Sequence, residues 1–137
     1  MAPTNVEDWL NIAKERAADA EAMKTQRCTS IGCVYMAGYA IECSLKALLQ
    51  NLGIPFPKHG QEGHNLRKLW ETSGFRLTDI HDPTGSKTFF IENWDTSLRY
   101  ELTCESSLSV TELVDGAKQL TGQIINKIRR SNTRSRK

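Results

Sequence analysis

A long apolar segment, residues 31–52, constrains the fold of this chain more than any other feature of its sequence. Its large side chains recur at helical spacing on most sides of a helix; they are Ile31, Val34, Tyr35, Tyr39, Ile41, Leu45, Leu48 and Leu49. A helix that is apolar around most of its circumference usually lies in the centre of a fold. Thr29 or Ser30 can cap its start, and Gly53 is a stop signal. We therefore expect a buried central helix over residues 31–52.

Two amphipathic patterns predict long helices near the two ends of the chain. The first follows a capping-box pattern, Thr4-Asn5-Val6-Glu7, and its apolar residues recur at helical spacing as far as Thr25. The last follows a second capping box, Ser109-Val110-Thr111-Glu112, and its pattern ends near Arg130. Each pattern has one apolar face, so both helices are expected to pack against the central helix.

Shorter helices are expected between the central helix and the last one. A short helix is predicted from His64 or Asn65 to Gly74, and a further helix over residues 86–98. The segment Phe89-Phe90-Ile91 also fits a strand, but the neighbouring helical patterns favour a helix. Because no convincing strand pattern appears, the predicted fold class is all-α. The predicted architecture is an up-and-down bundle of four or five helices.

Length and composition fit one globular domain. The chain has 137 residues, of which 39% are hydrophobic and 25% are charged, and no apolar run is long enough to cross a membrane. Because its start lacks a secretion-signal pattern, we expect a cytoplasmic protein without membrane contacts. No metal and no cofactor are predicted, and we expect reduced thiols rather than a metal site or a disulfide. The cysteines, none of them in a Cys-x-x-Cys pair, are Cys28, Cys33, Cys43 and Cys104.

Charge is distributed unevenly along the chain. Up to Asp115 the sequence contains 11 basic and 16 acidic residues, whereas after Asp115 it contains seven basic residues and no acidic one. Basic tails of this kind either dock on the phosphates of nucleic acids or remain solvated and disordered. We therefore divide the chain into a bundle at residues 4–130 and a basic, disordered tail at residues 131–137. The candidate nucleic-acid contacts at this end are Arg129, Arg130, Arg134 and Arg136.

Three short motifs follow one another along the predicted helices. The central helix contains Ala40-Ile41-Glu42-Cys43-Ser44-Leu45-Lys46-Ala47-Leu48 and is followed by Gly53. His64-Asn65-Leu66 opens the short helix, and Arg99-Tyr100 follows the next predicted helix. In order and spacing these motifs resemble the HEPN domain (higher eukaryotes and prokaryotes nucleotide-binding) over about residues 6–128.

The resemblance implies a function in binding. Proteins of this family are helical bundles that form homodimers and bind nucleotides or RNA. Bacterial examples are often paired with a minimal nucleotidyltransferase, or they act in toxin–antitoxin and anti-phage systems. A further interpretation is a purely structural assembly domain whose basic tail contacts a partner or a nucleic acid.

Glu42 and Lys46 are candidate ligand-binding residues. They stand four residues apart, in the orientation that favours an ion pair on one helix face. By the resemblance, the pair lies near a groove between helices. The alternative interpretation is a partly solvated ion pair worth about a few tenths of a kcal/mol. His64, at the start of the next helix, is expected to satisfy free backbone groups with its ring.

Arg99 and Tyr100 are the other candidates. An arginine beside an aromatic residue can hold a phosphate and a base, or it can anchor the following loop through backbone carbonyls. In the RNA-cleaving proteins that the chain resembles, a histidine for proton transfer follows such an arginine. Here no histidine follows His81, and Glu101 and Glu105 are poor substitutes because carboxylates repel RNA. We therefore expect a binding module; the alternative is a metal-independent endoribonuclease, a toxin, with an altered site centred on Arg99.

Overall fold

The computed structural model describes residues 3–57, 63–101 and 108–135. Its elements, with η marking a 3-10 helix, are α1 (Val6–Gln26), α2 (Ile31–Leu52), α4 (Leu66–Thr72), η1 (Leu77–Asp79), α5 (Ser86–Asn93), η2 (Thr96–Tyr100) and α6 (Val110–Ser135). No strand occurs in the described ranges, so the predicted all-α class is confirmed and the strand alternative for residues 89–91 is wrong. Within the same ranges, no helix is long and apolar enough to cross a membrane.

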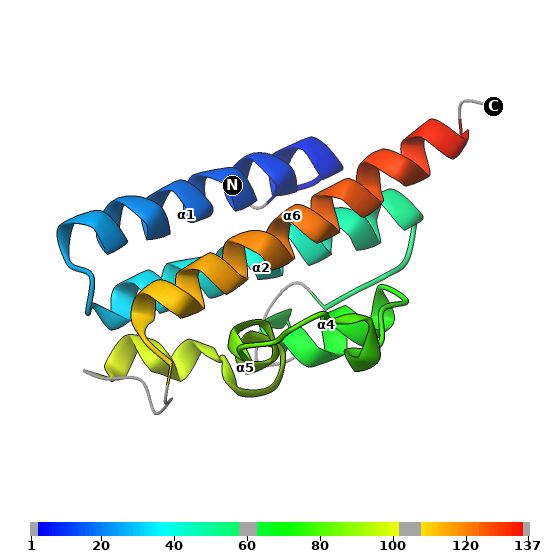
Figure 1. Ribbon diagram of the computed structural model, residues 1–137. Helices are drawn as coiled ribbons and strands as arrows, with labels where there is room; N and C mark the ends of the chain where they lie inside the picture. Colours follow the sequence, from blue (N-terminus) through cyan, green and yellow to red (C-terminus); the bar gives the residue numbers. More distant parts are fainter. Residues whose placement is uncertain (1–2, 58–62, 102–107, 136–137) are drawn as a thin grey trace.

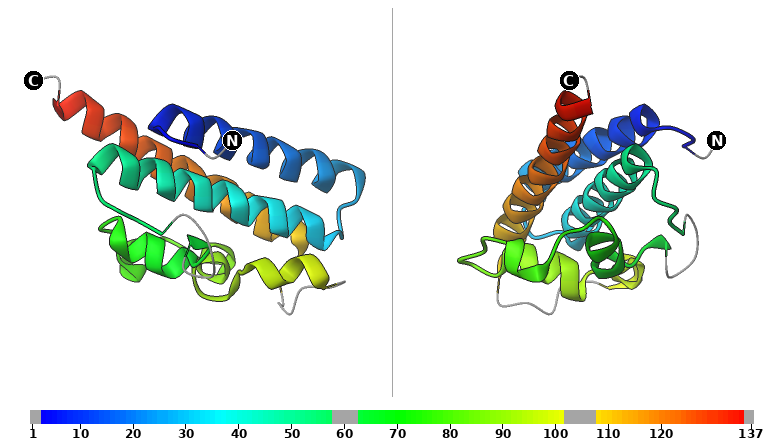
Figure 2. Two further views of the ribbon diagram at one scale, coloured as in Figure 1. Left: turned by 180° about the vertical axis from the view of Figure 1, so that it is seen from behind. Right: turned by 90° about the vertical axis from the view of Figure 1, so that its right-hand side faces the viewer.

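The three long helices lie side by side, and the short helices cover one side of α2 (Figures 1 and 2). α1 runs antiparallel to α2, whereas α6 runs in the same direction as α2 (Figure 1). The segment from α4 through α5 to η2 returns along the far side of α2 and leads towards the start of α6. Successive legs of the chain therefore alternate in direction, as the predicted up-and-down bundle requires.

α2 is the central element of the bundle. It packs most extensively against α1 and α6 and also contacts α4 and η2. Because it has neighbours on most sides, every residue from 40 to 49 is buried. The Ser30 side chain caps its start by accepting a hydrogen bond from the Gly32 N–H, and Gly53 ends it in a left-handed conformation with φ 70°. The predicted limits of this helix are therefore confirmed.

The caps of the two terminal helices follow the predicted patterns with one shift. At the start of α1, Asn5 Oδ1 accepts a hydrogen bond from the Asp8 N–H at 2.9 Å, so the cap lies one residue after Thr4. At the start of α6, Ser109 Oγ accepts a hydrogen bond from the Glu112 N–H at 3.1 Å, as the capping box predicts. Both helices therefore begin where short polar side chains satisfy their first free N–H groups.

The helix predicted over residues 86–98 is shorter than expected, because α5 ends at Asn93. The next residue, Trp94, adopts an extended backbone with φ −72° and ψ 135°, and its indole packs against Gly38 of α2. Asp95 then caps η2 with its side chain. A contact with a distant helix therefore ends α5, and helical spacing within the segment does not reveal such a contact.

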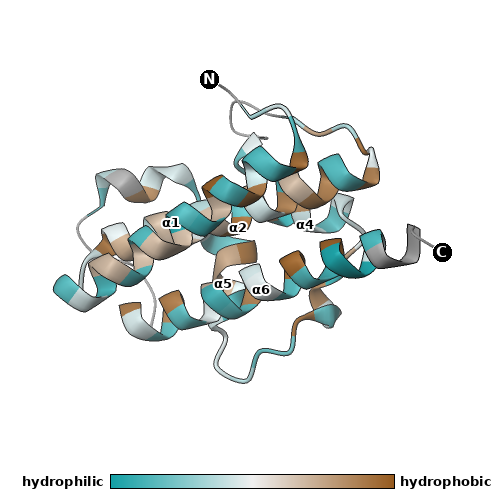
Figure 3. Cartoon of the chain, turned by 90° about the horizontal axis from the view of Figure 1, so that it is seen from above, coloured by the Kyte–Doolittle hydropathy of each residue, from teal (hydrophilic) through white to brown (hydrophobic). Residues whose placement is uncertain are grey.

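α6 is longer than expected and continues to Ser135 instead of ending near Arg130. Residues 131–135 contain neither glycine nor proline, and basic side chains near a helix C-terminus interact favourably with the helix dipole. The first five residues of the expected disordered tail, 131–135, therefore extend the helix. Hydrophobic and hydrophilic residues alternate along α6 (Figure 3). The buried apolar residues on its inner face are Leu113, Val114, Ala117, Leu120, Ile124 and Ile128.

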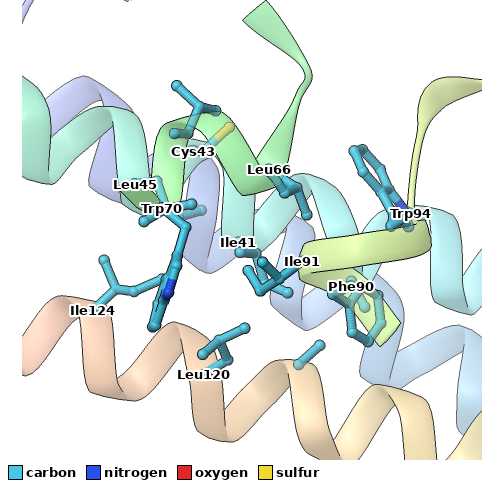
Figure 4. Close-up of a cluster of buried hydrophobic side chains, with 14 of the residues drawn as sticks. Ile41, Cys43, Leu45, Leu66, Trp70, Phe90, Ile91, Trp94, Leu120 and Ile124 are labelled. Atoms are coloured by element: carbon cyan, nitrogen blue, oxygen red, sulfur yellow. The ribbon is translucent and has the colours of Figure 1, made fainter. Parts of the chain in front are cut away.

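The core extends across the faces that α2, α4, α5 and α6 share (Figure 4). Trp70 of α4 is fully buried and stacks on Phe75, with ring centroids 4.0 Å apart and an interplanar angle of 12°. Its Nε1 donates a hydrogen bond to the Arg76 carbonyl at 3.0 Å, which satisfies the polar edge of the ring. Further side chains of this cluster are Ile41, Leu45, Leu66, Phe90, Ile91, Trp94, Leu120 and Ile124.

Replacing Gly38 by alanine should destabilise the bundle. A Cβ atom at this position would overlap the Trp94 indole. We expect Gly38→Ala to lower the free energy of unfolding by about 1–3 kcal/mol, the usual cost of overpacking. Gly122, in α6, is the matched control, because a Cβ there meets nothing within 4 Å. Gly122→Ala should raise stability by up to about 1 kcal/mol through helix propensity. Urea titration measures both, and equal effects would contradict the proposed contact.

Candidate functional site

Glu42 is the centre of a buried ionic network that joins α2 to His64, the residue directly before the N-cap residue of α4. Its Oε2 accepts a hydrogen bond from Lys46 Nζ at 3.0 Å, and its Oε1 lies 2.8 Å from His64 Nδ1. Glu42 is 3% exposed and Lys46 is 1% exposed. The alternative interpretation of a partly solvated ion pair is therefore wrong, because the two charges are removed from water almost completely.

Helix geometry and one aromatic side chain explain why these charges can be buried. Glu42 and Lys46 lie one turn apart on α2, so their side chains meet on one face. Lys46 Nζ also lies 5.2 Å from the centre of the Trp9 ring of α1, within the range of a cation–π contact. Paired, hydrogen-bonded charges avoid most of the penalty of an isolated buried charge. The network therefore joins α1 and α2 as well as the approach to α4.

The His64 ring contacts a carboxylate and not the backbone groups that the sequence led us to expect. A carboxylate accepts hydrogen bonds, so Nδ1 carries the hydrogen and the opposite ring nitrogen, Nε2, remains for other contacts. The side chain of His64 is 30% exposed, and its ring also meets the Tyr39 ring edge-on, with centroids 6.0 Å apart. His64 is therefore held in one orientation while part of it stays accessible.

The network lies at the wall of a groove between α1 and α2, which we call the α1–α2 groove. The groove encloses about 360 Å³, a size that suits a small ligand. Its lining from α1 is Trp9, Ile12 and Arg16, and its lining from α2 is Met36, Tyr39, Glu42, Cys43 and Lys46. Pro3 and His64 also line it. The two helices present these residues at spacings of three and four, so each set lies along one helix face.

His64 also lines a second cavity, which we call the η2 cavity. It encloses about 510 Å³ and is lined by His64, Asn65, Arg67 and residues 91–97. Two of its lining side chains, Glu92 and Asp95, are acidic. His64 is therefore a shared wall between two cavities of different chemical character.

The structure brings only part of the predicted site together. Glu42 and Lys46 meet as predicted and line the α1–α2 groove. The backbone of Arg99 belongs to η2, which contacts α2, but its side chain lies outside the described part of the structure. Tyr100 is 77% exposed and lines neither cavity. The Arg99–Tyr100 pair therefore remains a prediction as a ligand site.

The other predicted candidates lie at the margins of the structure. Arg129 and Arg130 are exposed on α6. The side chain of Arg134 is not among those described, and Arg136 and Glu105 lie outside the described residues. Among the described residues, no group of three or more His, Cys, Asp or Glu side chains could hold a metal ion.

Sequence reasoning missed the α1 side of the groove. Trp9, Ile12 and Arg16 recur at spacings of three and four, but none of them is among the predicted site residues. An arginine in line with an apolar stripe was the signal available in the sequence. It could not be weighed without knowing that α2 presents Glu42 and Lys46 opposite it.

Replacing Glu42 by glutamine should destabilise the protein strongly. The substitution removes the negative charge with which the buried Lys46 pairs, and breaking a buried ion pair by changing one partner costs about 3–5 kcal/mol. Glu71→Gln is the matched control, because Glu71 pairs with Arg67 at the same spacing, but both side chains are 55% exposed. That exposed pair is worth at most about 1 kcal/mol. Chemical denaturation of both variants measures the difference, and a small effect at both positions would contradict the buried network.

Cys43 should be unreactive in the folded protein. Burial, with a smaller contribution from Glu42, raises the pKa of its thiol to about 12. Burial also raises the pKa of the Cys33 thiol, whereas Cys28 is exposed. In a Cys104→Ser variant at mildly alkaline pH, a thiol reagent should therefore modify Cys28 quickly and the other two only after unfolding. A fast reaction that disappears in Cys43→Ala would contradict this expectation.

Comparisons with known proteins place the chain in a family. The sequence matches the HEPN domain over residues 6–128 of its 137 residues. The crystal structure of ST0689, an archaeal HEPN homologue, matches with a TM-score of 0.59 and 19% sequence identity, covering 92% of this chain and 99% of that chain. At this identity the likeness supports the fold alone. No curated protein sequence matches the chain. The resemblance found in the motifs is therefore confirmed, and the chain belongs to the HEPN domain family.

Proposed function

We propose that this protein is a binding module for a nucleotide or RNA, and that the α1–α2 groove holds the ligand. The observation that carries the proposal is the Glu42–Lys46–His64 network at the wall of this groove. Two aromatic side chains, Trp9 and Tyr39, line the same space. Aromatic walls beside fixed polar groups suit a flat base with hydrogen-bonding edges.

The residues near Arg99 in the sequence favour binding over cleavage. No histidine follows His81 in the sequence, so the usual partner of the arginine in RNA-cleaving family members is missing. Glu92 and Asp95 line the neighbouring η2 cavity, and Glu101 follows η2 in an exposed position. Carboxylates at these positions repel a phosphate backbone.

The proposal extends to assembly and to nucleic-acid contacts outside the groove. From family membership we expect a homodimer. We also expect a partner such as a minimal nucleotidyltransferase in a toxin–antitoxin or anti-phage system. A monomer in light scattering would argue against the homodimer.

Arg129 and Arg130, exposed on α6, are candidate phosphate contacts. Removing residues 129–137 should then reduce the salt dependence of RNA binding, and an unchanged dependence would exclude this role.

Binding should depend on His64. We expect the full-length protein to bind nucleoside phosphates or short RNA in calorimetric titration. His64→Ala should weaken that binding by about 3- to 10-fold, the value of one hydrogen bond. His81→Ala is the control and should bind like the wild type, because His81 is exposed and lines neither cavity. The absence of any binding by the wild type would refute the proposed function.

The same preparations test the alternative of an endoribonuclease. RNA incubated with the wild-type protein and without metal ions should remain intact. Cleavage that is lost in Arg99→Ala would instead establish an altered active site centred on this arginine, and the binding-module proposal would have to be abandoned.

A further inference from the structure

We propose that Arg16 binds the phosphate of the ligand in the α1–α2 groove, so the phosphate lies beside α1 and not in the η2 cavity near Arg99. This inference rests on the proposed nucleotide-binding function and adds a specific residue to it. The sequence motifs do not include Arg16, and it was not among the candidate site residues. Three properties of the groove support the assignment.

The first property is the charge of the two cavities. Among its described lining residues, the α1–α2 groove has two basic side chains, Arg16 and Lys46, and one acidic side chain, Glu42. The described residues of the η2 cavity have the opposite balance, with Arg67 as the basic side chain and with Glu92 and Asp95 as the acidic ones. Apart from His64, which both cavities share, the described lining of the groove is therefore net positive and that of the η2 cavity is net negative. A phosphate is attracted to the groove and repelled by the cavity.

The second property is the availability of Arg16. Lys46 is almost completely buried and is paired with Glu42, so an incoming phosphate does not reach it easily. Arg16 is 39% exposed in its side chain and stands on the same face of α1 as Trp9. Its Nε lies 3.0 Å from Asp19 Oδ2 but is not aligned with it for a hydrogen bond. The guanidinium therefore keeps donors that match the geometry of a phosphate.

The third property is the neutrality of the surrounding wall. Met36 and Tyr39 face the groove from α2 and carry no charge at neutral pH. Cys43 also lines it, and burial raises the pKa of its thiol to about 12, so this side chain adds no negative charge near Arg16. A ligand can therefore place its base against the aromatic side chains and its phosphate towards Arg16.

Two variants with opposite expected effects test the assignment. The probes are the four nucleoside 5′-monophosphates and the four corresponding nucleosides, titrated against full-length protein. Arg16→Gln should weaken binding of the monophosphate by about 10- to 100-fold and leave binding of the nucleoside unchanged, because only the charged hydrogen bonds are removed. Asp19→Asn frees Arg16 from its exposed ion pair and should tighten binding of the monophosphate by up to about five-fold.

Tryptophan fluorescence shows which cavity is occupied. Trp9 lines the α1–α2 groove and Trp94 lines the η2 cavity. The change in fluorescence on binding should disappear in Trp9→Phe and persist in Trp94→Phe. The reverse pattern, or an Arg16→Gln variant that binds the monophosphate like the wild type, would overturn the assignment while leaving the binding function intact. A wild-type protein that binds neither nucleotides nor RNA would remove both proposals together.

Discussion

The carboxylate of Glu42 is the contact on which the placement of three parts of the chain depends. One oxygen holds Lys46 on the next turn of α2, and the other holds His64 before α4. Lys46 in turn lies over Trp9 of α1. A buried charge that lacks its partner costs several kcal/mol, so the network is favourable only when its members are assembled. The packing of α1 on α2 and the path of the chain into α4 are therefore linked through one side chain.

Local signals in the sequence predicted the helices well where the helix ends are set by local chemistry. Ser30, Gly53 and Ser109 act through hydrogen bonds or backbone conformations that involve only neighbouring residues. The limits of α2 and the start of α6 followed from them. The end of α5 did not, because it depends on Trp94 meeting a glycine of α2 far away in the sequence.

The candidate site was predictable only in part for the same reason. The pairing of Glu42 with Lys46 follows from their spacing, but its burial depends on Trp9 and on His64, 22 residues beyond Glu42. Spacing within one helix does not reveal what covers that helix. The proposed phosphate position beside Arg16 also could not be read from the Arg99–Tyr100 motif, since the proposal depends on the summed charge of residues contributed by several elements.

Because α6 continues to Ser135, the basic end of the chain loses less backbone conformational entropy when it binds a partner. A disordered segment loses backbone freedom when it docks, at about 1–2 kcal/mol for each residue that becomes fixed. Residues 129–135 are already helical, because they continue the helix that the core holds as far as Ile128. The exposed Arg129 and Arg130 therefore stand on a preformed helix, and a polyanion that met them would gain charge contacts with little further loss of entropy.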